Sequence, residues 1–302
     1  MKLSTTIPDQ FYATFGIEKS IEVLAEIGFD ALDMNLIGTI FREEFSDDRL
    51  EATCLSLRRL AESCGVSFNQ AHAPFPSFIF KSRGNETPGA YNARVKPKIL
   101  SAIRAAGILG AGQIVVHPIS VPDKREQKQF NLDYYNSLAP TAKEYGVKIA
   151  LENMWGTSRT DPGKIVANVC SLSYDLADYF DALDPSVFTV CLDVGHSGLV
   201  GETAEDAIRV LGHDRLHALH VHDNDHLRDL HTIPYLGKLN WENVTKALAD
   251  IRYDGDFTFE VCGTYCAPFE GKPDLLRKSF ELVELVGRDL ISRIEAAGAA
   301  QV

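Results

Sequence analysis

Long apolar runs and clusters of basic residues are both missing from this chain of 302 residues. No stretch of about 18 consecutive apolar residues occurs, so we expect no membrane-spanning helix. Residues 1–10 lack a charged segment followed by an apolar core, so we expect no signal peptide. The formal net charge is −12, and the densest basic stretches are only the pairs Arg58–Arg59 and Lys124–Arg125. Because such an acidic chain repels phosphate backbones, we do not expect nucleic acid as a partner.

Paired cysteines and nucleotide-binding glycine motifs are absent as well. The chain has six cysteines, and none of them forms a C-x-x-C pair. In a chain of this length they are typical of reduced thiols, so we expect a cytoplasmic protein. No G-x-G-x-x-G or phosphate-binding loop follows any candidate strand, which argues against an open dinucleotide-binding sheet. With 45% hydrophobic and 24% charged residues, the composition is that of an ordinary globular protein.

Short apolar segments alternate with longer amphipathic segments along the whole chain. The short segments are rich in Val, Ile, Phe and Thr, which favours strands that are buried on both faces. The predicted strands are Leu3–Ile7, Ala31–Leu36, Val66–Ala73, Gln113–His117, Lys148–Asn153, Phe188–Asp193, Leu216–His222 and Asp256–Val261. Apolar residues at helical spacing predict helices at Ile17–Gly28, Asp47–Gly65, Tyr91–Gly110, Leu132–Gly146, Leu172–Leu183, Ala204–Leu211, Trp241–Ile251 and Leu275–Ala297. Four of these helices end at a glycine, as expected for short connections between a helix and the next strand.

Eight strands that alternate with eight helices predict an all-parallel α/β sheet. In a single domain covering residues 1–302, eight such units favour a closed (β/α)8 TIM barrel over an open doubly wound sheet. The longest irregular segments are Pro74–Ala90, Pro118–Phe130 and Asp223–Asn240, and each of them follows a strand. We therefore expect these loops at the C-terminal face of the barrel, where the active sites of this fold form.

Six consecutive predicted strands end with a side chain that can bind a metal ion. These residues are His72, His117, Glu152, Asp193, His220 and Glu260. Burying an ionised carboxylate in an apolar strand is costly unless the carboxylate is paired or bound to a cation. Three carboxylates at one rim would also repel each other and take up protons. The pattern therefore predicts a divalent metal ion; carboxylates mixed with imidazole favour Mn²⁺ or Zn²⁺, and Co²⁺ or Mg²⁺ are also compatible.

Four segments, in this order, resemble the xylose-isomerase-like barrel superfamily, which contains sugar isomerases and epimerases and also the endonuclease IV branch. The segments are Leu151-Glu152-Asn153, Cys191-Leu192-Asp193-Val194-Gly195-His196, His220-Val221-His222-Asp223-Asn224 and the stretch from His231 to Trp241. The resemblance covers nearly the whole chain. It implies that Glu152, Asp193, His220 and Glu260 hold one metal ion, and that the two glutamates are catalytic and transfer protons to and from a sugar.

The endonuclease branch implies a larger set of metal ligands. His72, His117, His196, Asp229 and His231 match positions that help to bind three zinc ions in that branch. By this resemblance the chain could hold two or three metal ions and hydrolyse a phosphodiester. The alternative is that these side chains bind sugar hydroxyls or support the ligands of a single ion.

The acidic charge and the stretch from His231 to Trp241 favour a metal-dependent sugar isomerase or epimerase. Such an enzyme removes the proton next to a carbonyl and proceeds through an enediolate. Three alternatives stay open. They are a multinuclear zinc phosphoesterase or abasic-site endonuclease, a lyase or dehydratase that enolises a sugar or cyclitol, and a sugar-binding barrel without catalysis.

Aromatic and polar residues near the predicted site are candidate substrate contacts. The candidates are Trp155, Phe75, His222 and Lys238. Phe75 lies in a loop with Phe78 and Phe80, and such rings could stack on a sugar face or pack beneath the loop. We expect a small sugar as the substrate, and the family resemblance implies a homo-oligomer, either a dimer or a tetramer.

Overall fold

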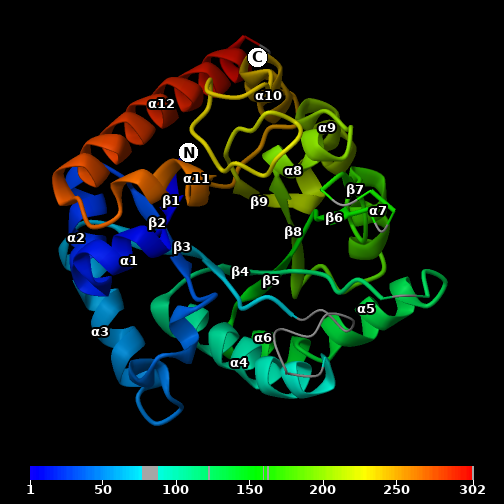
Figure 1. Ribbon diagram of the computed structural model, residues 1–302, viewed down its shortest axis with the longest axis horizontal. Coiled ribbons are helices and arrows are strands. Elements are labelled where there is room, and N and C mark those ends of the chain that lie inside the picture. Colours follow the sequence, from blue (N-terminus) through cyan, green and yellow to red (C-terminus); the bar gives the residue numbers. More distant parts are fainter. Residues whose placement is uncertain (77–87, 122, 159, 162, 301–302) are drawn as a thin grey trace.

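The computed structural model contains a parallel sheet that curves into a nearly closed barrel surrounded by helices (Figure 1). It describes residues 1–76, 88–121, 123–158, 160–161 and 163–300. Phe78 and Phe80 therefore lie outside the described residues, whereas Phe75 is described. Within these ranges, no helix is long and apolar enough to cross a membrane.

The predicted strands are confirmed. They are β1 (Leu3–Thr6), β2 (Ala31–Asn35), β3 (Ser67–His72), β4 (Gln113–Val116), β5 (Lys148–Glu152), β8 (Phe188–Asp193), β9 (Leu216–His220) and β10 (Phe257–Phe259). Their order in the sheet is β10-β1-β2-β3-β4-β5-β8-β9, and the paired strands run parallel. Val221 N donates to Thr258 O at 2.9 Å, and Glu260 N donates to Val221 O at 3.0 Å. These bonds join the two outer strands just beyond β9, which confirms the parallel barrel.

Helices cover the outside of this barrel (Figure 1). The α-helices of the described residues are α1 (Asp9–Phe15), α2 (Ile17–Ile27), α3 (Leu50–Ser63), α4 (Pro88–Leu109), α5 (Gln127–Asn136), α6 (Ala139–Tyr145), α7 (Ser173–Phe180), α8 (Val194–Leu199), α9 (Ala204–Arg215), α10 (Trp241–Asp250), α11 (Gly263–Cys266) and α12 (Pro273–Ala299). The 3-10 helices are η1 (Thr39–Phe41), η2 (Glu43–Phe45) and η3 (Ala267–Phe269). The glycines predicted to end helices, Gly28, Gly65, Gly110 and Gly146, all adopt positive φ.

Two features differ from the predicted order of elements. The helix predicted over Leu132–Gly146 is two helices, α5 and α6, because Pro140 lies in the first turn of α6 and has no N–H for a preceding turn to bind. The segments after the strands also carry elements that were not predicted. These are α1, α8, α11, the three 3-10 helices and an antiparallel hairpin formed by β6 (Trp155–Thr157) and β7 (Ile165–Ala167).

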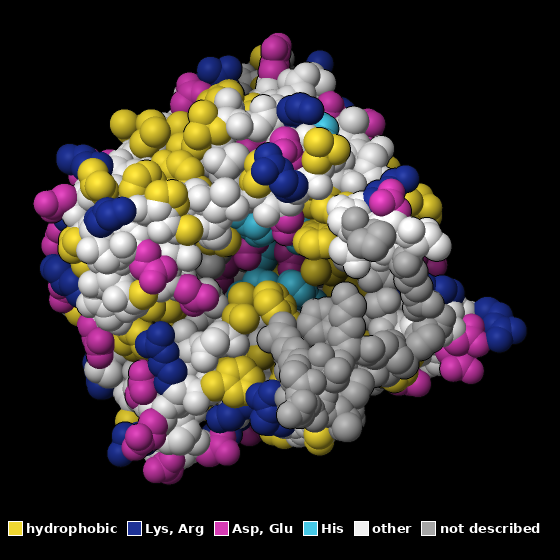
Figure 2. Space-filling model, viewed as in Figure 1, with side chains coloured by type: hydrophobic (Ala, Val, Ile, Leu, Met, Phe, Trp, Pro, Cys, Tyr) yellow, Lys and Arg dark blue, Asp and Glu magenta, His cyan; other side chains and the backbone are white. Residues whose placement is uncertain are grey.

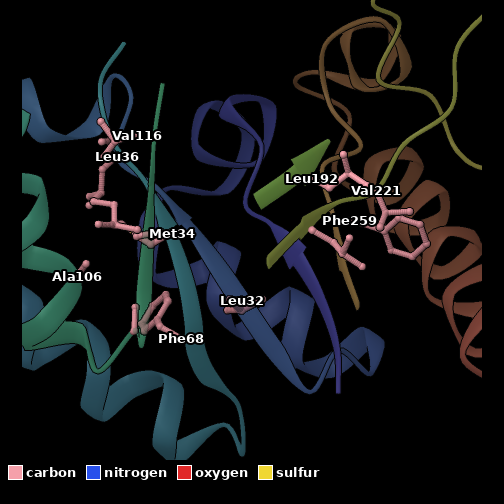
Figure 3. Close-up of a cluster of buried hydrophobic side chains, with 14 of the residues drawn as sticks. Leu32, Met34, Leu36, Phe68, Ala106, Val116, Leu192, Val221 and Phe259 are labelled. Atoms are coloured by element: carbon pink, nitrogen blue, oxygen red, sulfur yellow. The ribbon is translucent and has the colours of Figure 1, made fainter. Parts of the chain in front are cut away.

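The large apolar core lies on the outer face of the strands. This core includes Leu32 and Met34, which are two positions apart in β2, and Leu36, which directly follows the strand (Figure 3). Ala106 of helix α4 belongs to the same cluster. Because the side chains of a strand alternate between its two faces, Asp33 points to the opposite face, into the barrel.

The inner face of the barrel is smaller and more polar. A separate apolar cluster there consists of Val115, Ala150, Cys191 and Ala218, from β4, β5, β8 and β9. Thr6, Asp33 and Gln70 are buried nearby in a hydrogen-bonded group. Small apolar side chains therefore leave room inside the barrel for polar groups beneath the strand ends.

Candidate metal centre

The C-terminal ends of the strands enclose a hollow that is lined by histidine and acidic side chains. Figure 2 shows these side chains gathered near the centre of the face that looks down the barrel. The predicted central ligands and the additional predicted ligands form one connected cluster there. The cluster consists of three overlapping groups, which are centred on Glu152, on His220 and on Asp229. The position of each residue follows from the strand or loop that carries it.

Glu152, at the end of β5, is the point where two sets of histidines meet. Its Oε2 lies 2.7 Å from His117 Nε2 and 3.6 Å from His72 Nε2. The two imidazoles also contact each other, with 3.1 Å between their Nε2 atoms. Glu152 Oε1 lies 2.7 Å from His220 Nδ1. His72, His117 and Glu152 can therefore offer ligand atoms to one ion.

His220, at the end of β9, joins Glu152 to Glu260. Its Nδ1 lies 2.7 Å from Glu152 Oε1 and 3.5 Å from Glu260 Oε2. All three side chains are buried. Glu152, from the end of β5, and Glu260, directly after β10, thus converge on a single nitrogen atom of His220.

Asp193, the remaining predicted central ligand, ends β8 and also caps helix α8. Its Oδ1 accepts a hydrogen bond of 2.8 Å from the backbone N–H of His196. Its two carboxylate oxygens lie 2.9 and 3.0 Å from His222 Nε2. Asp193, His222, His231 and Glu260 can present ligand atoms that all lie within 4.8 Å of one another. Asp193 therefore adjoins the other central residues through Glu260.

Asp229 and His231 bring the third group together from the loop that follows β9. Asp229 Oδ2 lies 3.3 Å from His196 Nε2 and 3.2 Å from His231 Nε2. His231 Nδ1 lies 3.4 Å from Glu260 Oε2, so this group touches the central one. The additional predicted ligands are therefore close enough to share ions with the central ligands or to support them.

The charges in the cluster shift the proton affinities of its members. Burial alone would raise the pKa of Glu152, but His220 and His117 outweigh burial and hold this pKa well below its usual range. Burial also disfavours the charged form of His196, but Asp193 and Asp229 outweigh it and raise the pKa of His196 to about 10. The neighbouring imidazoles thus favour the ionised form of the Glu152 carboxylate, and a divalent cation can supply the same positive charge.

Several buried polar atoms of the site make no hydrogen bond within the described part of the chain. They include Asp33 Oδ1, His220 Nε2 and Asp229 Oδ1. Leaving such an atom without a partner typically costs about 1–3 kcal/mol, which a bound ion or water can offset. Carboxylate oxygens mixed with imidazole nitrogens are a donor set that suits Mn²⁺ or Zn²⁺. The residues of the site therefore fit a divalent metal ion.

The family of the chain follows from its sequence as well as from this arrangement. Residues 21–284 match the model of a protein family described as the xylose isomerase-like TIM barrel. The chain belongs to this family. Membership agrees with the resemblance stated from the sequence and with the barrel described above.

Relatives of this xylose isomerase-like barrel include proteins with and without an assigned activity. An uncharacterised protein of Methanocaldococcus jannaschii is 28% identical, with 81% of this chain and 78% of that protein covered. A D-psicose 3-epimerase of Enterocloster bolteae is 24% identical, with 80% of this chain and 76% of that protein covered.

Solved structures with the same fold carry the names of sugar epimerases. A D-psicose 3-epimerase, crystallised in the presence of D-fructose, has a TM-score of 0.71 and 18% identity over 96% of this chain and 99% of its own. A D-tagatose 3-epimerase-like protein has a TM-score of 0.66 and 23% identity over 94% of this chain and 98% of its own. At these identities the likeness shows the fold.

Three of the predicted substrate contacts lie beside the candidate metal ligands of this xylose isomerase-like barrel. The ring of Phe75 stacks on His117 with 4.7 Å between ring centroids. Trp155 Nε1 donates a hydrogen bond of 3.1 Å to Asp229 Oδ2. His222 stacks on His231 with 3.9 Å between centroids, in addition to its contact with Asp193.

Lys238, the other predicted substrate contact, differs from these three. Its side chain is exposed, and its backbone N–H donates a hydrogen bond of 2.8 Å to Asn224 O. The contacts that place Lys238 are thus backbone contacts within the loop that follows β9.

Sequence reasoning did not single out two side chains that hold the site together. Asn153 Nδ2 donates to Asp193 O at 2.9 Å, and Asn153 Oδ1 accepts from Asp193 N at 2.7 Å. This pair of bonds fixes the end of β5 against the end of β8. Asp223 Oδ2 accepts from Trp241 Nε1 at 2.8 Å, and its Oδ1 accepts from Leu239 N at 3.1 Å. Asn153 directly follows β5 and Asp223 lies shortly beyond β9, so a polar residue at or just after the end of an apolar strand is the signal that could have identified them.

We expect Gly195→Ala to disrupt the centre, because a Cβ at Gly195 would overlap the imidazole of His222. The added methyl group must move either His222 or the start of α8, and both carry groups that contact Asp193. Misplacing a site residue by about 1 Å can cost roughly 100-fold in activity, and we expect a loss of this order in kcat/KM. Gly298→Ala is the matched control, since a Cβ at this helical glycine meets open space. Equal activity in both variants would contradict the assignment of His222 to the centre.

Proposed function

We propose that this protein is a divalent-metal-dependent sugar isomerase or epimerase that moves a proton next to a carbonyl. The observation that carries the proposal is the convergence of Glu152 and Glu260 on His220 Nδ1, at 2.7 and 3.5 Å. Two carboxylates from well-separated strands thus flank one position at the mouth of the barrel. The sugar epimerases among the structural neighbours support the same reaction class.

Glu152, Asp193, His220 and Glu260 are the residues that we propose as ligands of the metal ion. Their contacts form a continuous set, because Glu260 adjoins both His220 and the group that contains Asp193. When bound, a divalent cation supplies Lewis-acid polarisation of a carbonyl and its neighbouring hydroxyl. His72, His117, His196, Asp229 and His231 then support the ligands or bind sugar hydroxyls.

The two glutamates are proposed to perform the proton transfers. One carboxylate accepts the proton from the carbon next to the carbonyl, and the electron pair of that C–H bond moves toward the carbonyl oxygen to give an enediolate. For epimerisation, the other glutamate returns a proton to the same carbon from the opposite face, and the configuration is inverted. For isomerisation, the first glutamate returns its proton to the neighbouring carbon, and the hydroxyl proton passes to the former carbonyl oxygen.

Aromatic rings form part of the wall of the proposed pocket. Phe75 stacks on His117, and Trp155 is tied to Asp229. Both rings carry apolar faces that can stack on a sugar ring and exclude water from the enediolate. The polar cluster then meets the hydroxyl side of the sugar, while the rings meet its apolar side.

The test is exchange of substrate hydrogen with solvent. The protein is loaded with Mn²⁺ and incubated in D₂O with D-psicose, D-tagatose and D-fructose in turn, and the sugars are followed by NMR and mass spectrometry. We expect deuterium to enter at the carbon next to the carbonyl of at least one sugar, together with the appearance of its epimer or isomer. Loss of water from the sugar would instead indicate a dehydratase. Binding of Mn²⁺ without exchange in any of a broad panel of ketoses and aldoses would overturn the proposal.

A multinuclear zinc phosphoesterase is the second candidate function. The observation that favours it is the presence of further ligand groups beside the central one, His72–His117–Glu152 and His196–His222–Asp229–His231. The net charge of −12 argues against a nucleic-acid substrate. Hydrolysis of bis(p-nitrophenyl) phosphate by the zinc-loaded protein, without sugar exchange by the manganese-loaded protein, would place this candidate first.

A further inference from the structure

We propose that Asp33 is a positioning residue that fixes the imidazole of His220 in the orientation needed at the metal centre. The inference rests on the proposed function, because it assigns His220 Nδ1 to the metal. It extends the site inward by one residue, from the strand ends into the interior of the barrel. Nothing in the sequence motifs that identify the family includes Asp33, which lies in Ala31-Leu32-Asp33-Met34-Asn35.

The two ring nitrogens of His220 face different carboxylates. Nδ1 faces the mouth of the barrel, at 2.7 Å from Glu152 Oε1 and 3.5 Å from Glu260 Oε2. Nε2 faces the interior, at 3.5 Å from Asp33 Oδ2. Asp33 and His220 are both completely buried. The ring therefore lies between the proposed ligands on one side and a single interior carboxylate on the other.

Asp33 is itself held rigidly. Its Oδ2 accepts a hydrogen bond of 2.7 Å from Thr6 Oγ1 and one of 3.3 Å from Gln70 Nε2. Gln70 Oε1 in turn accepts from Gln113 Nε2 at 3.4 Å. These partners come from β1, β3 and β4, so three strands fix the carboxylate that faces His220.

The arrangement has the form that metal-binding histidines usually adopt. A ligating imidazole commonly directs its second ring nitrogen to a carboxylate, which sets the orientation of the ring and strengthens the nitrogen as a ligand. Asp33 is the carboxylate in that place for His220. His220 Nε2 makes no hydrogen bond within the described residues, so it can donate to Asp33 Oδ2 after a small closure of the 3.5 Å gap.

The position of Asp33 also explains why a charged side chain occurs in the middle of β2. An ionised carboxylate inside a barrel is expensive, and replacing it by an apolar residue would remove that cost. Thr6 and Gln70 satisfy only Oδ2. A role in orienting His220, whose Nε2 lies 3.5 Å from the same Oδ2, accounts for this buried carboxylate. Because Asp33 acts through His220, it is a positioning residue and does not itself contact the substrate.

The experiment compares Asp33→Asn and Asp33→Ala with the wild type and with Asn69→Ala. Asn69 bonds Ser4 Oγ at 2.8 Å and Thr258 Oγ1 at 3.1 Å, so its replacement also removes two hydrogen bonds near the strands but leaves Asp33 and His220 in contact. Affinity for Mn²⁺ alone is measured by calorimetry, thermal unfolding reports the fold, and ¹⁵N NMR of the histidines reports which nitrogen of His220 carries a proton.

We expect Asp33→Ala to weaken Mn²⁺ binding by about 10- to 100-fold, the usual effect of removing the carboxylate behind a ligating histidine. Asp33→Asn should fall between this variant and the wild type, because a neutral acceptor makes a weaker hydrogen bond. Both should change the His220 signals, while Asn69→Ala should change neither the affinity nor those signals. Wild-type affinity and unchanged His220 signals in both Asp33 variants would overturn the role of Asp33 alone. Failure of the wild type to bind Mn²⁺ would instead remove the metal centre on which the inference rests.

Discussion

Replacing Glu152 or Glu260 with Gln is expected to lower kcat for sugar epimerisation or isomerisation by roughly 10²- to 10⁴-fold, the range typical for loss of a general acid or base. Glutamine keeps the size of the side chain and can still accept a hydrogen bond, but it cannot take up or return a proton. Both glutamates are buried and flank His220, so each substitution acts on the site without removing much packing. The measurement is kcat on whichever sugar shows solvent exchange.

Two controls separate proton transfer from other effects of these substitutions. Glu205→Gln changes a half-buried glutamate that bonds Asn243 on the outside of the barrel, and it should retain full activity. Mn²⁺ affinity of Glu152→Gln and Glu260→Gln shows how much of the loss is due to weaker metal binding. A variant that exchanges substrate hydrogen with D₂O without inverting the carbon would show that the remaining glutamate still removes a proton. Wild-type turnover in either variant would exclude that glutamate as a proton carrier.

Metal binding is expected to stabilise the protein strongly and to depend on Asp193. A ligand that binds only the folded state at a free concentration of about 100 times its Kd raises the free energy of unfolding by roughly 2.7 kcal/mol. We expect this gain for Mn²⁺ in the wild type and its loss in Asp193→Asn, because Asp193 is fully buried and provides one of the proposed ligand carboxylates. Thermal unfolding with and without Mn²⁺ measures it, and a chelator should abolish turnover.

The matched control for Asp193→Asn is Asp178→Asn. Asp178 is an aspartate on α7 that pairs with Lys128 on the outside of the barrel, and its replacement should leave the Mn²⁺-dependent stabilisation intact. Elemental analysis of protein purified without added metal completes the test. One Mn, Co or Zn per chain supports the central site, and two or three Zn per chain would favour the phosphoesterase candidate. Equal stabilisation of wild type and Asp193→Asn would remove Asp193 from the ligand set.

The strands and most helices could be predicted because their signals are local. A run such as Phe188–Asp193 reads as a strand from its own residues, and the structure confirms it with the same bounds. The division of the predicted Leu132–Gly146 helix was not predicted, although Pro140 was visible within it. The hairpin of β6 and β7 was also missed, because strands of three residues carry too little hydrophobic pattern to be distinguished from a loop.

The candidate site could be predicted in part because burying charge is costly. Glu152, Asp193 and Glu260 stand out in apolar strands, and the structure brings them into one cluster with His220. Asp33 carries the same signal within Ala31–Asn35 but does not end a strand, so attention to strand ends passed over it. Packing across several strands decides which nitrogen of His220 faces which carboxylate. It also decides that Asp193 contacts His222.

The sequence by itself determined the alternation of strands and helices and the presence of ionisable residues at the ends of six strands. These follow from hydrophobic periodicity and from the free-energy cost of burying charge, which act within a few residues. Only the tertiary structure decided the pairing of the ligands, the polar group beneath them and the contact of Trp155 with Asp229. These contacts join residues from strands far apart in the chain. Their geometry is fixed by closure of the barrel, which no local pattern encodes.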